Sequence, residues 1–234
     1  MGHAAAEALD STVGAVIFDL DGVLVDSEIW WHEERVDWAR LRGLTWSLED
    51  SRAVMGANSR GWARIMRERM GLPPTEDEAI EADIVDRVVR RYVHGAPEIE
   101  GAIATLRAVA ERWPVAIASS AHRAVIDAAL DATGLGGVIP VVVSSDDVEH
   151  GKPAPDVYFE AARQLGVSAG ACLVIEDSLN GVRAARAAGM IVVLVPNESI
   201  PPAAGAAELA DLVLARLADL EPASVTRRMS YRSR

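Results

Sequence analysis

Short apolar runs recur along this chain without the alternation of apolar and polar residues that marks a strand exposed on one face. The runs lie at residues 15–18, 115–118, 138–143, 173–175 and 191–195. Strands that are buried on both faces of a parallel sheet have this continuous apolar pattern. We therefore expect these five runs to be strands of one parallel sheet.

Helical patterns separate most of these runs, and three of them end at a glycine. Residues 123–133 precede Gly134, residues 156–165 precede Gly166, and residues 178–188 precede Gly189. Glycine is common just past a helix C-terminus because it adopts the left-handed conformation without strain. The alternation of strands and helices predicts an α/β fold with a doubly wound parallel sheet.

The alternation is interrupted between the first two strands. Residues 29–96 contain no comparable strand pattern and include five of the six tryptophans, and eight arginines lie between Arg52 and Arg91. We expect residues 29–96 to form an inserted α-helical domain, and residues 14–28 with 97–234 to form the core domain. Most of these tryptophans should pack inside the small helical domain rather than stack on a substrate.

The composition narrows the classes of protein to which the chain can belong. It has 234 residues, half of them hydrophobic, and a net charge of −12, which suits a globular protein that does not bind nucleic acid. No apolar stretch approaches the ~20 residues that span a bilayer, so we expect no membrane partner and a cytoplasmic location. The single cysteine, Cys172, lies in an apolar run and should be a buried structural thiol.

Acidic residues follow two of the predicted strands, at the edge of the sheet where α/β folds bind ligands. Asp19 and Asp21 follow the first strand, and Glu176 and Asp177 follow the run at 173–175. Turn formation or helix capping would also account for each pair alone. Two ionised carboxylates ~4 Å apart repel by about 4 kcal/mol at an effective dielectric constant of 20, so four in one crevice imply a cation. Mg²⁺ fits because it commonly bridges carboxylates and a substrate phosphate.

Three other polar residues are expected near the same edge. Ser119 and Ser120 follow the second strand, where Ser119 is a candidate for ligand contact and Ser120 is a better candidate for a helix N-cap. Lys152, in the loop at residues 151–155, is the only lysine among 23 basic residues. A lone ammonium indicates a site that needs a compact charge, although chance survival of one surface lysine would give the same composition.

Taken in order, these segments resemble the motifs of the haloacid dehalogenase-like superfamily, in the subgroup with a helical cap between the first and second motifs. The motifs here are residues 19–28, Ser119, residues 151–155 and residues 176–178. The resemblance implies a Rossmann-like core and Mg²⁺-dependent transfer of a phosphoryl group from a small phosphorylated metabolite. We expect a phosphatase, with a monomer favoured.

The resemblance also implies roles for individual residues. Asp19 is the implied nucleophile, which forms an aspartyl phosphate, and Asp21 is the implied general acid and base. Ser119 and Lys152 would hold the transferring phosphoryl oxygens. The implied metal ligands lie at the ends of two strands: Asp19, the backbone carbonyl of Asp21, Glu176 and Asp177. Contacts with the substrate are expected from Ser119, Ser120, Lys152 and, in the cap loop at residues 55–60, Gly56.

Three other functions compete with the phosphatase. A β-phosphoglucomutase-like isomerase shares the core motifs, but that branch has a histidine five residues after the aspartate that corresponds to Asp26, and it uses a cap lysine. Here the position is Trp31, His32 lies about 100° further round the helix, and the cap contains no lysine. A non-catalytic sensor of phosphorylated ligands is disfavoured because Asp19 and Asp21 are both present. A carbon–halogen hydrolase is disfavoured by Asp21.

Overall fold

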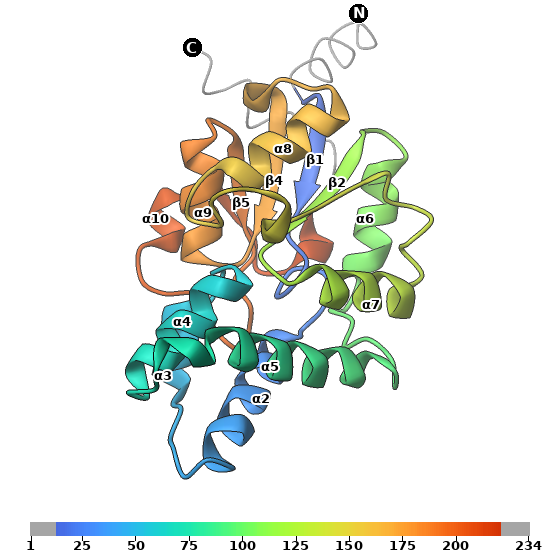
Figure 1. Ribbon diagram of the computed structural model, residues 1–234. Coiled ribbons are helices and arrows are strands. Elements are labelled where there is room, and N and C mark those ends of the chain that lie inside the picture. Colours follow the sequence, from blue (N-terminus) through green and yellow to red (C-terminus); the bar gives the residue numbers. More distant parts are fainter. Residues whose placement is uncertain (1–12, 221–234) are drawn as a thin grey trace, which may run out of the picture.

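A six-stranded parallel sheet organises the structure, a computed structural model that describes residues 13–220 (Figure 1). The strand order is β3-β2-β1-β4-β5-β6, so the chain starts in the middle of the sheet and builds outward in both directions. The strands are β1 (Ala15–Phe18), β2 (Val115–Ser119), β3 (Val141–Ser144), β4 (Cys172–Glu176), β5 (Ile191–Leu194) and β6 (Leu212–Val213).

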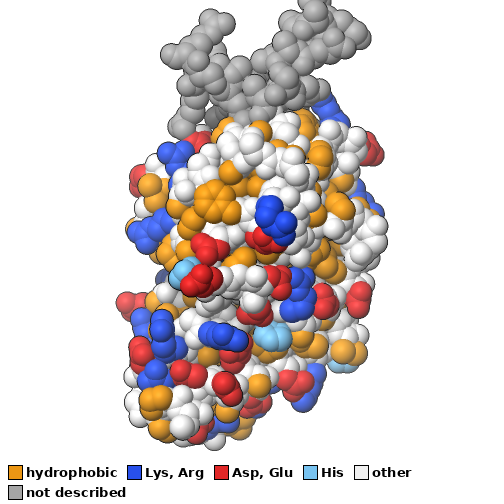
Figure 2. Space-filling model, turned by 45° about the horizontal axis from the view of Figure 1, so that its top comes forward, with side chains coloured by type: hydrophobic (Ala, Val, Ile, Leu, Met, Phe, Trp, Pro, Cys, Tyr) orange, Lys and Arg blue, Asp and Glu red, His pale blue; other side chains and the backbone are white. Residues whose placement is uncertain are grey.

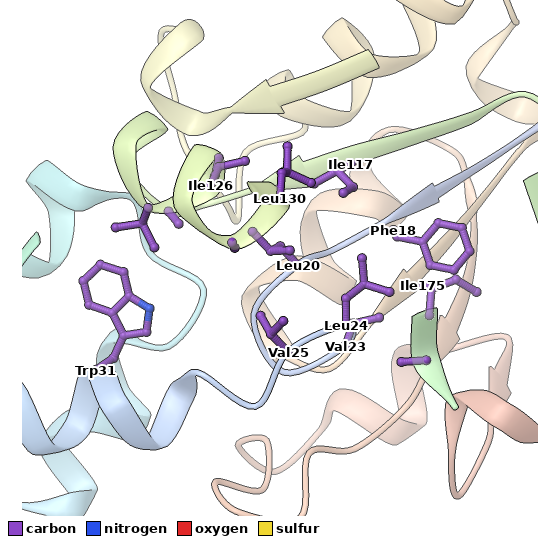
Figure 3. Close-up of a cluster of buried hydrophobic side chains, with 14 of the residues drawn as sticks. Phe18, Leu20, Val23, Leu24, Val25, Trp31, Ile117, Ile126, Leu130 and Ile175 are labelled. Carbon is purple, nitrogen blue, oxygen red and sulfur yellow. The ribbon is translucent and has the colours of Figure 1, made fainter. Parts of the chain in front are cut away.

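Helices cover both faces of the sheet, as expected for the doubly wound fold. Val16 and Phe18 point to the face that packs on α6 (Ala102–Ala110) and α7 (Arg123–Thr133). Ala15 and Ile17 point to the face that packs on α8 (Asp156–Leu165), α9 (Leu179–Ala187) and α10 (Ala206–Leu209). In Figure 3, Phe18, Ile117 and Ile175 from three adjacent strands lie together in the first of these layers. The prediction of a doubly wound α/β core is confirmed.

The predicted elements differ from the observed ones at a few ends. The third strand begins at Val141 rather than at residue 138, because residues 135–139 form a turn in which the Val138 N–H donates to the Leu135 carbonyl at 2.8 Å. The strand β6 was missed because it has only two residues, which pair with Val193 and Leu194. Four short 3₁₀ helices complete the described elements: η1 (Pro74–Glu76), η2 (Ser145–Asp147), η3 (Ala169–Ala171) and η4 (Leu217–Asp219).

The segment between β1 and α6 is helical and lies beyond the C-terminal ends of the strands (Figure 1). Its four helices are α2 (Glu28–Arg40), α3 (Leu48–Val54), α4 (Ser59–Arg69) and α5 (Asp77–Tyr92). The chain leaves the core and returns to it side by side: the Asp26 N–H donates to the Pro97 carbonyl at 2.7 Å, and the Ile99 N–H donates to the Leu24 carbonyl at 3.1 Å. This double connection places the helical segment over the strand ends.

Arginines join the helices of this segment to one another. Arg67 on α4 pairs with Asp77 at 2.8 Å, and Arg91 on α5 pairs with Glu34 on α2 at 2.6 Å. Acidic and basic side chains are mixed over the face of the molecule drawn in Figure 2. Ion pairs between helices therefore account for part of the high arginine content of the segment.

Two expectations from composition can be compared with the structure. Cys172 is buried, and burial raises the pKa of its thiol to about 11, so the expected structural thiol is confirmed. Among the described residues, no helix combines the length and the apolar character needed to cross a bilayer.

Candidate active site

Parallel pairing brings the predicted core residues to one edge of the sheet. Phe18 of β1 is paired with Ile117 of β2 on one side and with Ile175 of β4 on the other. The residues that follow on these strands therefore meet at the same edge, since all three strands run in the same direction. Asp19 and Glu176 come together there, and Ser119 lies beside them.

The Lys152 ammonium lies at the centre of this edge. Its Nζ donates to Asp19 Oδ1 at 2.8 Å, to Glu176 Oε1 at 2.6 Å and to the Ala118 carbonyl at 3.1 Å. Burial lowers the pKa of Lys152, but the two carboxylates outweigh burial and raise it above its ordinary value. Lys152 is therefore a permanent buried cation whose three hydrogens are all in use.

Glu176 is held by hydrogen bonds to both carboxylate oxygens. Its Oε1 accepts from Lys152 and from the Tyr158 hydroxyl at 2.7 Å. Its Oε2 accepts from the backbone N–H groups of Asp177 and Ser178 and from the Ser178 hydroxyl, each at 3.0 Å. Burial opposes ionisation, but Lys152 and these donors lower the pKa of Glu176. Tyr158 belongs to α8, and no sequence motif pointed to it.

Asp177 is a buried carboxylate with an unused oxygen. Its Oδ2 has no hydrogen-bond partner among the described residues. Burial, and then the neighbouring Glu176, raise the pKa of Asp177 well above its usual range. Asp19, Glu176 and Asp177 each offer an oxygen within 4.8 Å of the others. A hard divalent cation such as Mg²⁺ binds oxygen ligands and would satisfy the unpartnered oxygen, so these residues fit the predicted metal.

Two glycines allow backbone to pack directly on these carboxylates. Gly22 has φ +80°, and a Cβ there would lie 1.9 Å from Asp177 Oδ2. A Cβ at Gly181, in the first turn of α9, would lie 1.7 Å from Glu176 Oε1. Any larger residue at either position would displace the acidic group.

Asp21 is positioned by side chains from the start of α2. Trp31 Nε1 donates to Asp21 Oδ1 at 3.2 Å, the Ser27 hydroxyl donates to the same oxygen, and Ser119 Oγ lies 3.5 Å from Oδ2. Burial outweighs these hydrogen bonds and raises the pKa of Asp21. His32 points elsewhere, with Nδ1 2.8 Å from the Ser51 hydroxyl on α3.

The loop between α3 and α4 touches the core through two hydrogen bonds. Ser120 Oγ donates to the Gly56 carbonyl at 2.7 Å, and Asn180 Nδ2 donates to the Met55 carbonyl at 2.9 Å. The expectation that Ser120 is an N-cap is wrong, because α7 begins two residues later than that role requires. Its N-cap is His122, whose Nδ1 accepts from the Ala124 N–H at 3.2 Å.

A cavity lies between the core and the inserted helices. The core contributes Asp19, Asp21, Ser120 and Asp177 to its lining. The helical segment contributes Glu28, which ends the first motif, and Trp31. It also contributes Met55 and Gly56 of the expected loop, and Arg35 and Trp62, which no motif had marked. Burial, and then the charge of Asp21, raise the pKa of Glu28 to about 7. Ser119 and Lys152 do not line the cavity and lie behind its acidic residues.

A family model for haloacid dehalogenase-like hydrolases matches residues 13–189. The chain belongs to this family. It is 36% identical over 195 residues to the protein CbbY of Rhodobacter capsulatus, which covers 79% of this chain and 86% of the relative. It is 31% identical to the fructose-1-phosphate phosphatase YqaB of Escherichia coli, over 75% of this chain and 92% of the relative.

The comparison with solved structures supports the same fold. A β-phosphoglucomutase from Clostridium difficile superposes with a TM-score of 0.83 at 20% identity, covering 95% of this chain and all of the other. At this identity the likeness establishes the fold alone. The chain is therefore an enzyme of the haloacid dehalogenase-like hydrolase family, and several of its relatives are named phosphatases.

Replacing Gly181 tests the close packing of α9 on Glu176. We expect Gly181→Ala to lower the free energy of unfolding by about 1–3 kcal/mol, since the new methyl group collides with a buried carboxylate. The matched control is Gly137→Ala, because a Cβ at Gly137 meets no atom within 4 Å. Urea unfolding measures both, and equal midpoints for the two variants would contradict the packing argument.

Replacing Asp177 tests the unpartnered carboxylate. Because the folded pKa of Asp177 is raised, its contribution to stability is full at low pH and is lost as the pH rises through that pKa. Without metal, Asp177→Asn should therefore melt roughly 2–4 °C higher than the wild type at pH 8, the effect of about 1 kcal/mol in a protein of this size. The gain should shrink at pH 5.

The same variant should lose the rise in melting temperature that Mg²⁺ gives the wild type. The control is Asp37→Asn, which removes an exposed carboxylate that pairs with Arg40. Thermal melts with Mg²⁺ or with EDTA compare the three proteins. Equal stabilisation of wild type and Asp177→Asn by Mg²⁺ would rule out Asp177 as a ligand.

Proposed function

We propose that the protein is a Mg²⁺-dependent phosphatase that hydrolyses small phosphomonoesters, such as sugar phosphates, through an aspartyl phosphate. The observation that carries the proposal is the Asp19 carboxylate, fixed by Lys152 in the wall of a cavity that it shares with Asp21 and Asp177. The phosphatases among the relatives support this substrate class.

The residues at the strand ends account for both half-reactions. Asp19 attacks phosphorus, the bond from phosphorus to the ester oxygen breaks, and Asp21 gives its proton to the leaving alcohol. Asp21 then takes a proton from water, the water oxygen attacks phosphorus, and inorganic phosphate leaves as Asp19 is regenerated. The raised pKa of Asp21 suits an acid that must be protonated in the first step. We assign the transferring phosphoryl oxygens to Ser119 and Lys152, and Lys152 would exchange one of its present hydrogen bonds for a phosphoryl oxygen when substrate enters.

We assign Mg²⁺ to Asp19, the Asp21 backbone carbonyl and Asp177. When bound, the ion offsets the negative charge of the phosphoryl oxygens and of the carboxylates around them. Glu176 would take part through water, because both of its oxygens already accept hydrogen bonds. Its direct task is to orient Lys152.

Residues 29–96 act as a cap over the core formed by residues 14–28 and 97–234. Gly56 and Ser120 close the cavity beside the leaving group through their shared hydrogen bond. Such small contacts can open and reform to admit substrate.

An isomerase of the β-phosphoglucomutase type is the second candidate, and the contact of Trp31 with Asp21 argues against it. An indole N–H donates a hydrogen bond but exchanges no proton near neutral pH, whereas an imidazole does both. The nearby His32 is turned toward Ser51 and cannot replace it. Nothing from the cap therefore couples closure to the protonation of Asp21 in the way a histidine would.

Asp19→Asn tests the nucleophile. The change is nearly isosteric and keeps an oxygen for Lys152, so the fold should persist while turnover of p-nitrophenyl phosphate and sugar phosphates falls at least ~1000-fold. Phosphate release is measured with Mg²⁺ present, and a thermal melt checks folding. Wild-type turnover, or a covalent phosphoenzyme in the variant, would exclude Asp19 as the nucleophile.

Supplying β-glucose 1-phosphate with a bisphosphate primer separates the two candidate functions. We expect free phosphate and little glucose 6-phosphate, since water reaches the aspartyl phosphate without a histidine to delay it. Both products are followed in one reaction. Glucose 6-phosphate that accumulates much faster than phosphate would establish the isomerase instead.

A further inference from the structure

Arg35 is a buried arginine in the wall of the active-site cavity. It lies on α2, seven residues after Glu28 and four after Trp31, so the three side chains share one face of the helix. The residue is only 5% exposed. This face of α2 lines the same cavity as Asp19 and Asp21 of the core.

Unlike the arginines that join the cap helices, Arg35 makes no ion pair within residues 13–220. Its Nε is buried and has no hydrogen-bond partner there, whereas Arg67 and Arg91 each contact a carboxylate. Burying a charge without a partner costs several kcal/mol. An arginine that is buried without an ion-pair partner in the wall of a ligand cavity indicates that the ligand itself supplies the partner.

Two indole rings hold the guanidinium in place. Its central carbon lies 5.2 Å from the Trp31 ring centroid and 4.8 Å from that of Trp62. The two rings are themselves 5.8 Å apart at an angle of 62°. Contacts of this kind occupy the faces of the guanidinium and leave its N–H edge free for hydrogen bonds.

The acidic groups near Arg35 do not neutralise it. Glu28 and Asp21 attract its charge from the neighbouring cavity wall, yet neither comes within ion-pair contact. Burial lowers the pKa of Arg35 to about 10, so the group stays protonated at neutral pH. A charged donor with a fixed orientation therefore faces the cavity.

We propose that Arg35 binds a second anionic group of the substrate, a carboxylate or a second phosphate, carried on the same molecule as the phosphoryl group that Asp19 attacks. The inference rests on the proposed phosphatase function and narrows its substrate class. The proposed function already assigns the transferring phosphoryl group to Lys152 and Ser119, which belong to the core. Arg35 belongs to the cap, and its planar N–H edge matches the two oxygens of a carboxylate or phosphate.

Matched substrates with and without the second anion test the proposal. Glycerol 3-phosphate is compared with 3-phosphoglycerate, and fructose 1-phosphate with fructose 1,6-bisphosphate, which separates a carboxylate from a phosphate as the second group. We expect wild-type kcat/KM to be about 10- to 100-fold higher for at least one doubly anionic partner, the range of one charge-assisted hydrogen bond. Equal values for both members of each pair would overturn the proposal.

Arg35→Gln should remove this preference by lowering kcat/KM for the doubly anionic substrate more than for its singly anionic partner. The ratio of kcat/KM within the preferred pair should fall about 10-fold or more, and Arg35→Lys should recover only part of it because lysine lacks the planar edge. The control is Arg42→Gln, since Arg42 also stacks on a cap tryptophan, 3.7 Å from the Trp38 centroid, but lies outside the cavity. A parallel loss for both members of the pair would reduce Arg35 to a packing role.

Measuring binding in a variant that does not turn over separates the test of Arg35 from the test of the proposed phosphatase function. In the Asp19→Asn background, the preferred substrate is titrated while the fluorescence of the tryptophans beside Arg35 is followed. Adding Arg35→Gln should weaken its dissociation constant about 10-fold, with a smaller effect on the singly anionic partner. Unchanged binding would reject the role of Arg35, whereas selective binding by a protein that hydrolyses none of these esters would reject only the phosphatase.

Discussion

The rest of the site depends on the buried ion pairs of Lys152. Its ammonium contacts Asp19, Glu176 and the Ala118 carbonyl, and so joins the ends of β1, β2 and β4. Without it, carboxylates this close would repel one another by about 4 kcal/mol per pair at an effective dielectric constant of 20. One ammonium cannot balance every carboxylate, and the unpartnered oxygen of Asp177 is what remains. Because the site lacks positive charge, its carboxylates repel one another, and a divalent cation would supply the missing charge.

The inserted helices line the cavity with different chemical groups from those of the core. The core side carries three carboxylates, Asp19, Asp21 and Asp177, at the edge of the sheet, while the face of α2 presents Glu28, Trp31 and Arg35. Trp31 serves both sides, because its N–H donates to Asp21 and its ring lies against Arg35. If residues 29–96 close over the core as proposed, the same movement would bring Trp31 to Asp21 and Arg35 to the cavity wall, and so would link substrate recognition to the position of the proposed acid.

Much of the core site follows from the sequence because it depends on local rules. Apolar runs locate the strands, parallel pairing sends their C-terminal ends to one edge, and residues just after a strand must lie at that edge. Asp19, Glu176 and Asp177 are brought together by this logic, and the lone Lys152 is placed by the need for a compact cation among them. Their roles in catalysis stay predictions that rest on the family resemblance.

The contacts between cap and core were decided only by the tertiary structure. The sequence showed that Trp31 and His32 lie about 100° apart around the helix, but not that the Trp31 N–H reaches Asp21, since that depends on the angle at which α2 crosses the strand ends. In the same way, the sequence suggested a capping role for Ser120, and the approach of the cap loop gave its hydroxyl a different partner. Local patterns determine which residues end a strand or share a helix face. The packing of the inserted helices on the core determines which of those faces meet, and pairs so distant in the chain leave no periodic signal.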